Sequence, residues 1–68
     1  MKAIHVINYI ASNPNIKNVV INSEDDKTPM QAIEYLSVVN FENNVADFRI
    51  NNTLEKGTLL VYDNFAKN

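Results

Sequence analysis

The strongest limit on what this chain can fold into is its length of 68 residues combined with the complete absence of cysteine. A domain of about this size buries only about 60% of the surface that its unfolded chain exposes, so its stability is marginal. Without cysteine, neither a disulfide nor a thiolate zinc site adds to that stability. We therefore expect one domain, residues 1–68, held together by a small apolar core or by an interface with a partner.

Apolar residues occur only in short runs. The longest covers residues 59–62, far below the roughly 18 apolar residues that a membrane-spanning helix needs. No apolar stretch typical of a signal peptide follows Met1 and Lys2. The sequence thus predicts a protein with no membrane-spanning segment.

Glycine occurs once, at Gly57, whereas asparagine occurs twelve times. Asparagine tolerates positive φ angles better than most residues and forms side-chain hydrogen bonds in turns. We therefore expect asparagine to occupy many of the turn positions that glycine usually takes, and the pair Asn43-Asn44 to form a two-residue hairpin turn.

An N-terminal helix is predicted over residues 2–12. Apolar side chains there recur three and four positions apart, and the sequence Asn13-Pro14-Asn15 ends the pattern. Alternation of apolar residues also permits a strand, but the helical spacing accounts for more of them. Residues 16–22, rich in β-branched side chains and followed by the acidic segment 23–27, form the clearest strand.

The segment that follows has two interpretations. Thr28 and Pro29 are suited to the start of a helix, which would cover residues 29–36 with Ile33 facing inward. Alternation of apolar residues equally predicts a strand over residues 33–42. The sequence does not decide between them.

The C-terminal half predicts an antiparallel meander. Its strands are residues 38–42, 45–51 and 58–63, and Gly57 provides the left-handed residue of the second connection. The predicted fold is therefore of the α+β class: an N-terminal helix packed on an antiparallel meander of three to four strands, with a short second helix at 29–36 as one alternative.

Residues that could carry out chemistry are few. His5 is the one histidine, and it falls on the predicted polar side of the first helix. The carboxylates Glu24, Asp25 and Asp26 lack the spacing of a calcium-binding loop. We therefore predict a protein that is not an enzyme, with no catalytic residue, no metal and no cofactor.

Nucleic-acid binding is also unfavourable. Six basic side chains are scattered singly among eight acidic ones, for a net charge of −2, whereas binding to phosphates needs a basic cluster. A phosphate-binding loop rich in glycine is excluded by the glycine count. A nucleic-acid-binding regulator is therefore the least favoured of the functions considered.

Protein binding remains as the favoured function. Aromatic side chains are enriched at protein interfaces. Phe41 and Phe48 are expected to pack together across the hairpin, whereas Tyr35, Tyr62 and Phe65 are predicted to be exposed and to contact a partner.

The last predicted strand, residues 58–63, would lie at an edge of the sheet. Asp63, with Asn64 beside it, gives that edge little protection. We therefore predict that Asp63 contributes to a contact surface and that the edge strand pairs with a second copy, forming a homodimer, or with the sheet of another protein.

The order of the segments resembles that of a group of small phage proteins. The segments are AIHVINYI at residues 3–10, SNPN at 12–15, VVI at 19–21, a polar loop, and IEY at 33–35. This order is similar to that of small uncharacterised proteins carried by phages and mobile elements of low-GC Gram-positive bacteria. The resemblance implies a mobile-element origin, a cytoplasmic setting in the host, and action by occupying a host or phage protein.

From the residues and this resemblance, we predict a small non-enzymatic protein-binding module, an inhibitor or accessory factor acting on a host protein. The alternative is a small structural subunit that assembles into a homo-oligomer.

Overall fold

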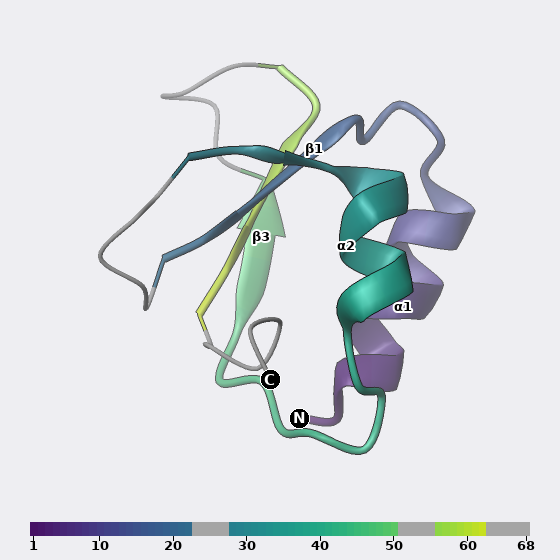
Figure 1. Ribbon diagram of the computed structural model, residues 1–68, viewed down its shortest axis with the longest axis vertical. Helices are drawn as coiled ribbons and strands as arrows, with labels where there is room; N and C mark the ends of the chain where they lie inside the picture. The colour runs from purple at the N-terminus through teal and green to yellow at the C-terminus, as the bar shows by residue number, and fades with distance from the viewer. Residues whose placement is uncertain (23–27, 51–55, 63–68) are drawn as a thin grey trace.

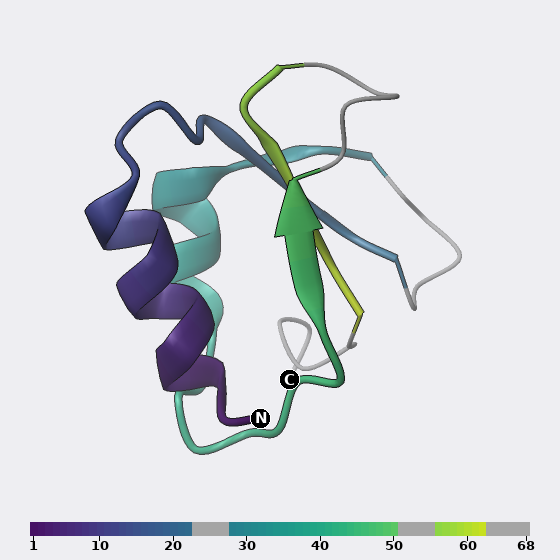
Figure 2. The same ribbon diagram turned by 180° about the vertical axis from the view of Figure 1, so that it is seen from behind.

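In the computed structural model, residues 1–22, 28–50 and 56–62 are described. The elements along the chain are α1 (Ala3–Ser12), β1 (Asn18–Ile21), β2 (Met30–Gln31), α2 (Ala32–Val38), β3 (Phe48–Ile50) and β4 (Thr58–Val61). Two helices and a four-stranded sheet confirm the predicted α+β class. Both helices lie on one face of the sheet, at the right in Figure 1 and at the left in Figure 2.

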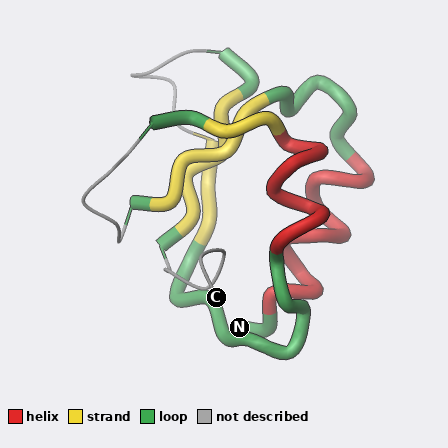
Figure 3. The backbone as a smooth tube through the Cα atoms, viewed as in Figure 1, coloured by secondary structure: helices red, strands yellow, loops and turns green. Residues whose placement is uncertain are grey.

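The sheet is mixed, with strand order β2-β1-β4-β3. β1 pairs with β4 in parallel, from Asn18 with Thr58 to Ile21 with Val61. The outer pairs, β1 with β2 and β3 with β4, are antiparallel. The prediction of an antiparallel meander is therefore wrong at the centre of the sheet, because β4 returns between β3 and β1 and does not continue outward from β3 (Figure 3).

The helix α1 forms where the sequence predicts it. Ala3, Val6 and Ile10, spaced three and four residues apart, are buried against the sheet. Asn13 ends the helix: its backbone N–H donates to the carbonyl of Ile10, and its side-chain amide donates to the carbonyl of Tyr9 at 2.7 Å. Asn13 thereby satisfies two carbonyl groups of the last turn, which an isolated helix end leaves without partners.

The helical interpretation of the segment around residues 29–36 is confirmed, and a strand over residues 33–42 is wrong. The helix begins later than predicted, because β2 occupies Met30–Gln31. Gln31, not Thr28, precedes the first turn, and the backbone N–H of Ala32 donates to the carbonyl of Lys17 at 2.8 Å. This start buries Ala32 and turns Ile33 outward, contrary to the inward orientation expected for Ile33.

Residues 39–47 connect α2 to β3 without the predicted hairpin. The connection turns at Asn40, whose carbonyl accepts from the backbone N–H of Asn43 and whose side chain accepts from that of Glu42. Asn43 and Asn44 pair instead with the N-terminal segment: the carbonyl of Asn43 accepts from Ala3, and Asn44 forms a β-bridge with Lys2. The predicted strand over 38–42 is therefore absent, and of the strand predicted over 45–51 the described residues form β3, which begins at Phe48, while residue 51 lies outside the described ranges.

The core lies between the helices and the sheet. Val19 and Ile21 of β1 and Leu59 and Val61 of β4 point into it, opposite the inward faces of α1 and α2. The ring of Phe48 packs against that of Tyr9, with centroids 5.0 Å apart. The predicted contact of Phe48 with Phe41 is wrong, because the connection after α2 carries Phe41 to the surface.

Gly57 fills the position that the sequence assigns to it. Its φ angle of +81° is the one positive value among residues 1–22, 28–50 and 56–62, so the expectation that asparagines also adopt positive φ is wrong for these residues. A Cβ atom on Gly57 would lie 2.6 Å from the carbonyl oxygen of Asn15. Both the backbone conformation and this close approach therefore require glycine.

We expect Gly57→Ala to lower the free energy of unfolding by at least about 2 kcal/mol, because left-handed backbone is strained for a residue with a Cβ and the carbonyl of Asn15 must move. Urea denaturation followed by circular dichroism measures the change. Substitution of the exposed neighbour, Lys56→Ala, should stay within about 0.5 kcal/mol of the natural protein. Equal stability of the two variants would contradict the strain at Gly57.

Thr58, the first residue of β4, is completely buried, and its hydroxyl has no hydrogen-bond partner among the residues that the structure describes. A buried hydroxyl without a partner costs about 1–3 kcal/mol relative to its hydrated state. Valine has nearly the same shape and carries a methyl group in place of the hydroxyl.

We expect Thr58→Val to raise the free energy of unfolding by about 1 kcal/mol, since it removes the unsatisfied hydroxyl and keeps the packing. The matched control is Thr58→Ser, which keeps the hydroxyl and removes the methyl group, and should destabilise the fold by about 1 kcal/mol. Thermal unfolding gives both values. A less stable valine variant would show that the hydroxyl is favourable where it lies.

Candidate functional site

The structure separates the residues that the sequence predicts as partner contacts. Tyr35 is completely buried between α2 and the sheet, so the prediction that it is exposed is wrong. The reason is the start of α2 at Ala32, which places Tyr35 one turn later on the same inward face. Tyr62 is half-buried, and Asp63 and Phe65 lie outside the described residues.

Tyr62 belongs to a pair on the sheet face that the helices leave open. The Arg49 Nε donates to the Tyr62 hydroxyl at 3.1 Å, and its Nη2 donates to the same oxygen. The guanidinium carbon lies 5.0 Å from the centre of the ring. The hydrogen bond to Tyr62 holds the pKa of Arg49 above its ordinary value, and Asp47 contributes in the same direction. The pair fixes one cation on the sheet surface.

The edges of the sheet are not where the sequence predicts them. β4 lies inside the sheet, between β1 and β3, so it offers no free edge. The edges are β2, with two residues, and β3, with three. On β3 the backbone N–H of Phe48 already donates to the Asp47 carboxylate at 2.8 Å. Edge strands of two and three residues offer few backbone groups for pairing with another strand. On β3 one of these groups, the amide of Phe48, is already occupied.

Among the residues that the structure describes, the exposed large apolar side chains belong to the helical side of the molecule. They lie on α1, on α2 or on the segments beside these helices. Their exposed fractions are 51% for Met1, 38% for Ile4, 74% for Ile33, 43% for Val38 and 57% for Phe41. None is on a strand of the described sheet.

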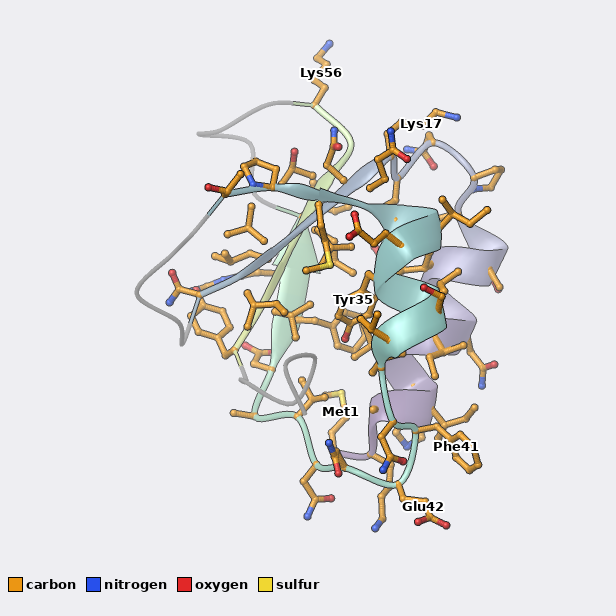
Figure 4. All side chains as sticks on the ribbon, viewed as in Figure 1. Met1, Lys17, Tyr35, Phe41, Glu42 and Lys56 are labelled. Carbon is orange, nitrogen blue, oxygen red and sulfur yellow. The ribbon has the colours of Figure 1, made fainter. Side chains whose placement is uncertain are left out.

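Four of these residues lie at one end of the helical layer, where α1 begins and α2 ends. Two backbone hydrogen bonds join the segments there: Ala3 N–H to the carbonyl of Asn43 at 2.8 Å, and Val45 N–H to that of Met1 at 2.6 Å. Figure 4 shows Met1 and Phe41 at this end. We name the surface the apolar end and define it by Met1, Ile4, Val38 and Phe41.

Two opposite charges border the apolar end. The Lys2 Nζ donates to the backbone carbonyl of Glu42 at 3.3 Å, and Glu42 directly follows Phe41 in the sequence. Both side chains are exposed, and no ion pair joins either of them to another described residue. Lys17 and Lys56 lie at the opposite end of the molecule from Glu42 (Figure 4).

The structure also places the residues considered for chemistry. His5 is exposed on α1. No group of three histidine, aspartate or glutamate residues that could hold a metal ion occurs within the described ranges, and the carboxylates of residues 24–26 fall outside them. Within the same ranges no helix has the length and apolar character that crossing a membrane requires.

Comparisons with protein-family models, with curated proteins and with solved structures give no match.

Sequence reasoning missed the apolar end because it assigned Phe41 and Val38 to a strand. The run Val38-Val39-Asn40-Phe41 begins with the last residue of α2 and continues into the connection, and its alternating apolar pattern continues that of residues 33–37. No signal in the sequence separates the exposed Val38 and Phe41 from Val39, which packs against the core.

Because Tyr35 belongs to the core, we expect Tyr35→Ala to unfold the protein or to destabilise it by about 3–5 kcal/mol, as removal of a buried aromatic ring does. Tyr62→Ala is the matched control, a tyrosine that is only half-buried, and should cost less than half as much. Urea denaturation measures both. If Tyr35→Ala were as stable as the natural protein, the placement of Tyr35 in the core would be contradicted.

Proposed function

We propose that this protein is a non-enzymatic protein-binding module and that the apolar end is its contact surface. The observation that carries the proposal is that Ile4, Val38 and Phe41, from three separate segments, are exposed together at one end of the helical layer. Contiguous exposed apolar patches on small proteins commonly mark sites of interaction with other proteins.

The residue types at the apolar end support this function. Aromatic residues and methionine are enriched at protein interfaces, and charged residues tend to lie around the apolar centre of an interface, not within it. Phe41 and Met1 supply the first two types, and Lys2 and Glu42 supply the border. The pattern is that of a small interface with an aromatic anchor.

The resemblance to small proteins of phages and mobile elements suggests the kind of partner. We propose a cytoplasmic protein of a low-GC Gram-positive host, which this chain inhibits or assists by occupying its surface. The short, protected edges of the sheet favour the apolar end over strand pairing as the way to reach that partner.

We expect the immobilised protein to retain one host protein in about equal amount from the soluble lysate of such a bacterium, and Phe41→Ser to weaken the retention at least about tenfold. Loss of one interface anchor commonly costs more than the 1.4 kcal/mol that corresponds to tenfold affinity. Calorimetric titration of the purified retained protein measures the affinity.

The matched control is Ile33→Ser. Ile33 is more exposed than Phe41 and lies on α2, but five positions before Val38, so it faces another side of the helix. We expect this variant to bind as the natural protein does. Equal binding by Phe41→Ser would remove the apolar end from the interface, and retention of no protein would contradict a host partner.

A further inference from the structure

We infer, resting on the proposed function for the assignment of the apolar end as a contact surface, that a second copy of this chain covers the apolar end when the partner protein is absent. The two copies form a dimer with two-fold symmetry. In such a dimer the same surface is used by both copies, so the surface must be complementary to itself.

The charges beside the apolar end meet this requirement. Lys2 and Glu42 carry opposite charges at one place, since the Lys2 Nζ lies 3.3 Å from the backbone carbonyl of Glu42. Neither forms an ion pair with another described residue. If the two-fold axis passes between these two side chains, it brings Lys2 of one copy to Glu42 of the other, and it does so twice, which makes a cluster of four alternating charges.

The apolar residues are complementary in the same way. Ile4 lies in the first turn of α1, Val38 is the last residue of α2 and Phe41 follows it, and all three are exposed, so two copies placed end to end at this point cover these side chains in both. A two-fold axis near Phe41 also places its ring close to its equivalent in the second copy, where aromatic rings attract each other. A host protein that binds more tightly then displaces the second copy by mass action.

Dimerisation through the apolar end also suits the size of the chain. A chain of 68 residues has a small core and gains proportionally more from additional burial than a larger domain does. The sheet edges do not provide this burial, because β2 and β3 are short and the amide of Phe48 is occupied.

Sedimentation equilibrium of the full chain between about 10 µM and 1 mM tests the inference, since a contact of micromolar affinity is largely formed in that range. We expect a dimer that Phe41→Ser weakens at least about tenfold. Lys2→Glu and Glu42→Lys should each weaken it about three- to tenfold, because each places like charges opposite one another. The double variant should return to near the natural affinity, because it restores the alternation of charges.

The matched control for charge is Lys56→Glu, which changes the net charge from −2 to −4 as Lys2→Glu does, but at the opposite end of the molecule. Ile33→Ser is the control for apolar exposure. Both should dimerise as the natural protein does, and circular dichroism verifies that every variant is folded.

A monomer at 1 mM overturns the inference, as does a dimer that Phe41→Ser and Lys2→Glu leave unchanged. Capture of a host protein by the monomer separates failure of the dimer from failure of the proposed function. A monomer whose capture of a host protein depends on Phe41 removes the dimer and keeps the contact surface. A monomer whose capture does not depend on Phe41 removes both.

Discussion

The parallel ladder between β1 and β4 joins residues 18–21 to residues 58–61, and the other strands attach to one side or the other of this pair. Contacts between segments so distant in sequence must offset a large loss of chain entropy. Buried side chains on both strands, such as Val19 and Leu59, provide that compensation. Gly57 allows the ladder to begin, because its carbonyl accepts from Lys17 and its lack of a side chain leaves room for Asn15.

The same ladder determines where the apolar residues of the helices end up. With β4 between β1 and β3, both helices pack on one face, and each helix has one inward stripe to fill. Tyr35 takes the inward position on α2, which leaves Ile33 and Val38 outside. The connection that carries the chain from α2 to β3 then places Phe41 beside the start of α1. The apolar end thus depends on contacts between segments that are distant in the sequence, such as Ala3 with Asn43, and not on any one motif.

What the sequence predicts correctly is local. Spacing of apolar residues locates α1, β-branched residues locate β1, and the one glycine locates a left-handed turn, because each of these depends on neighbours along the chain. The pairing of β1 with β4, the inward face of α2 and the exposure of Phe41 depend on contacts across the molecule. The inward face of α2 carries Ala32 and Tyr35, whereas the sequence pattern predicts Ile33 there, and nothing near residue 30 in the sequence determines which face of this short helix turns toward the sheet.

The apolar end differs from an ordinary exposed apolar residue in how it is held together. Ile33 is an isolated exposed side chain, and such residues are normal on protein surfaces. At the apolar end, by contrast, backbone hydrogen bonds of Ala3 and Val45 join the start of α1 to the connection that follows α2, so Ile4, Val38 and Phe41 belong to adjoining segments and are exposed at one place. Contiguous exposed apolar patches are rarer on monomeric proteins than single exposed residues such as Ile33. The contact surface that we propose accounts for this grouping, which a single exposed residue would not call for.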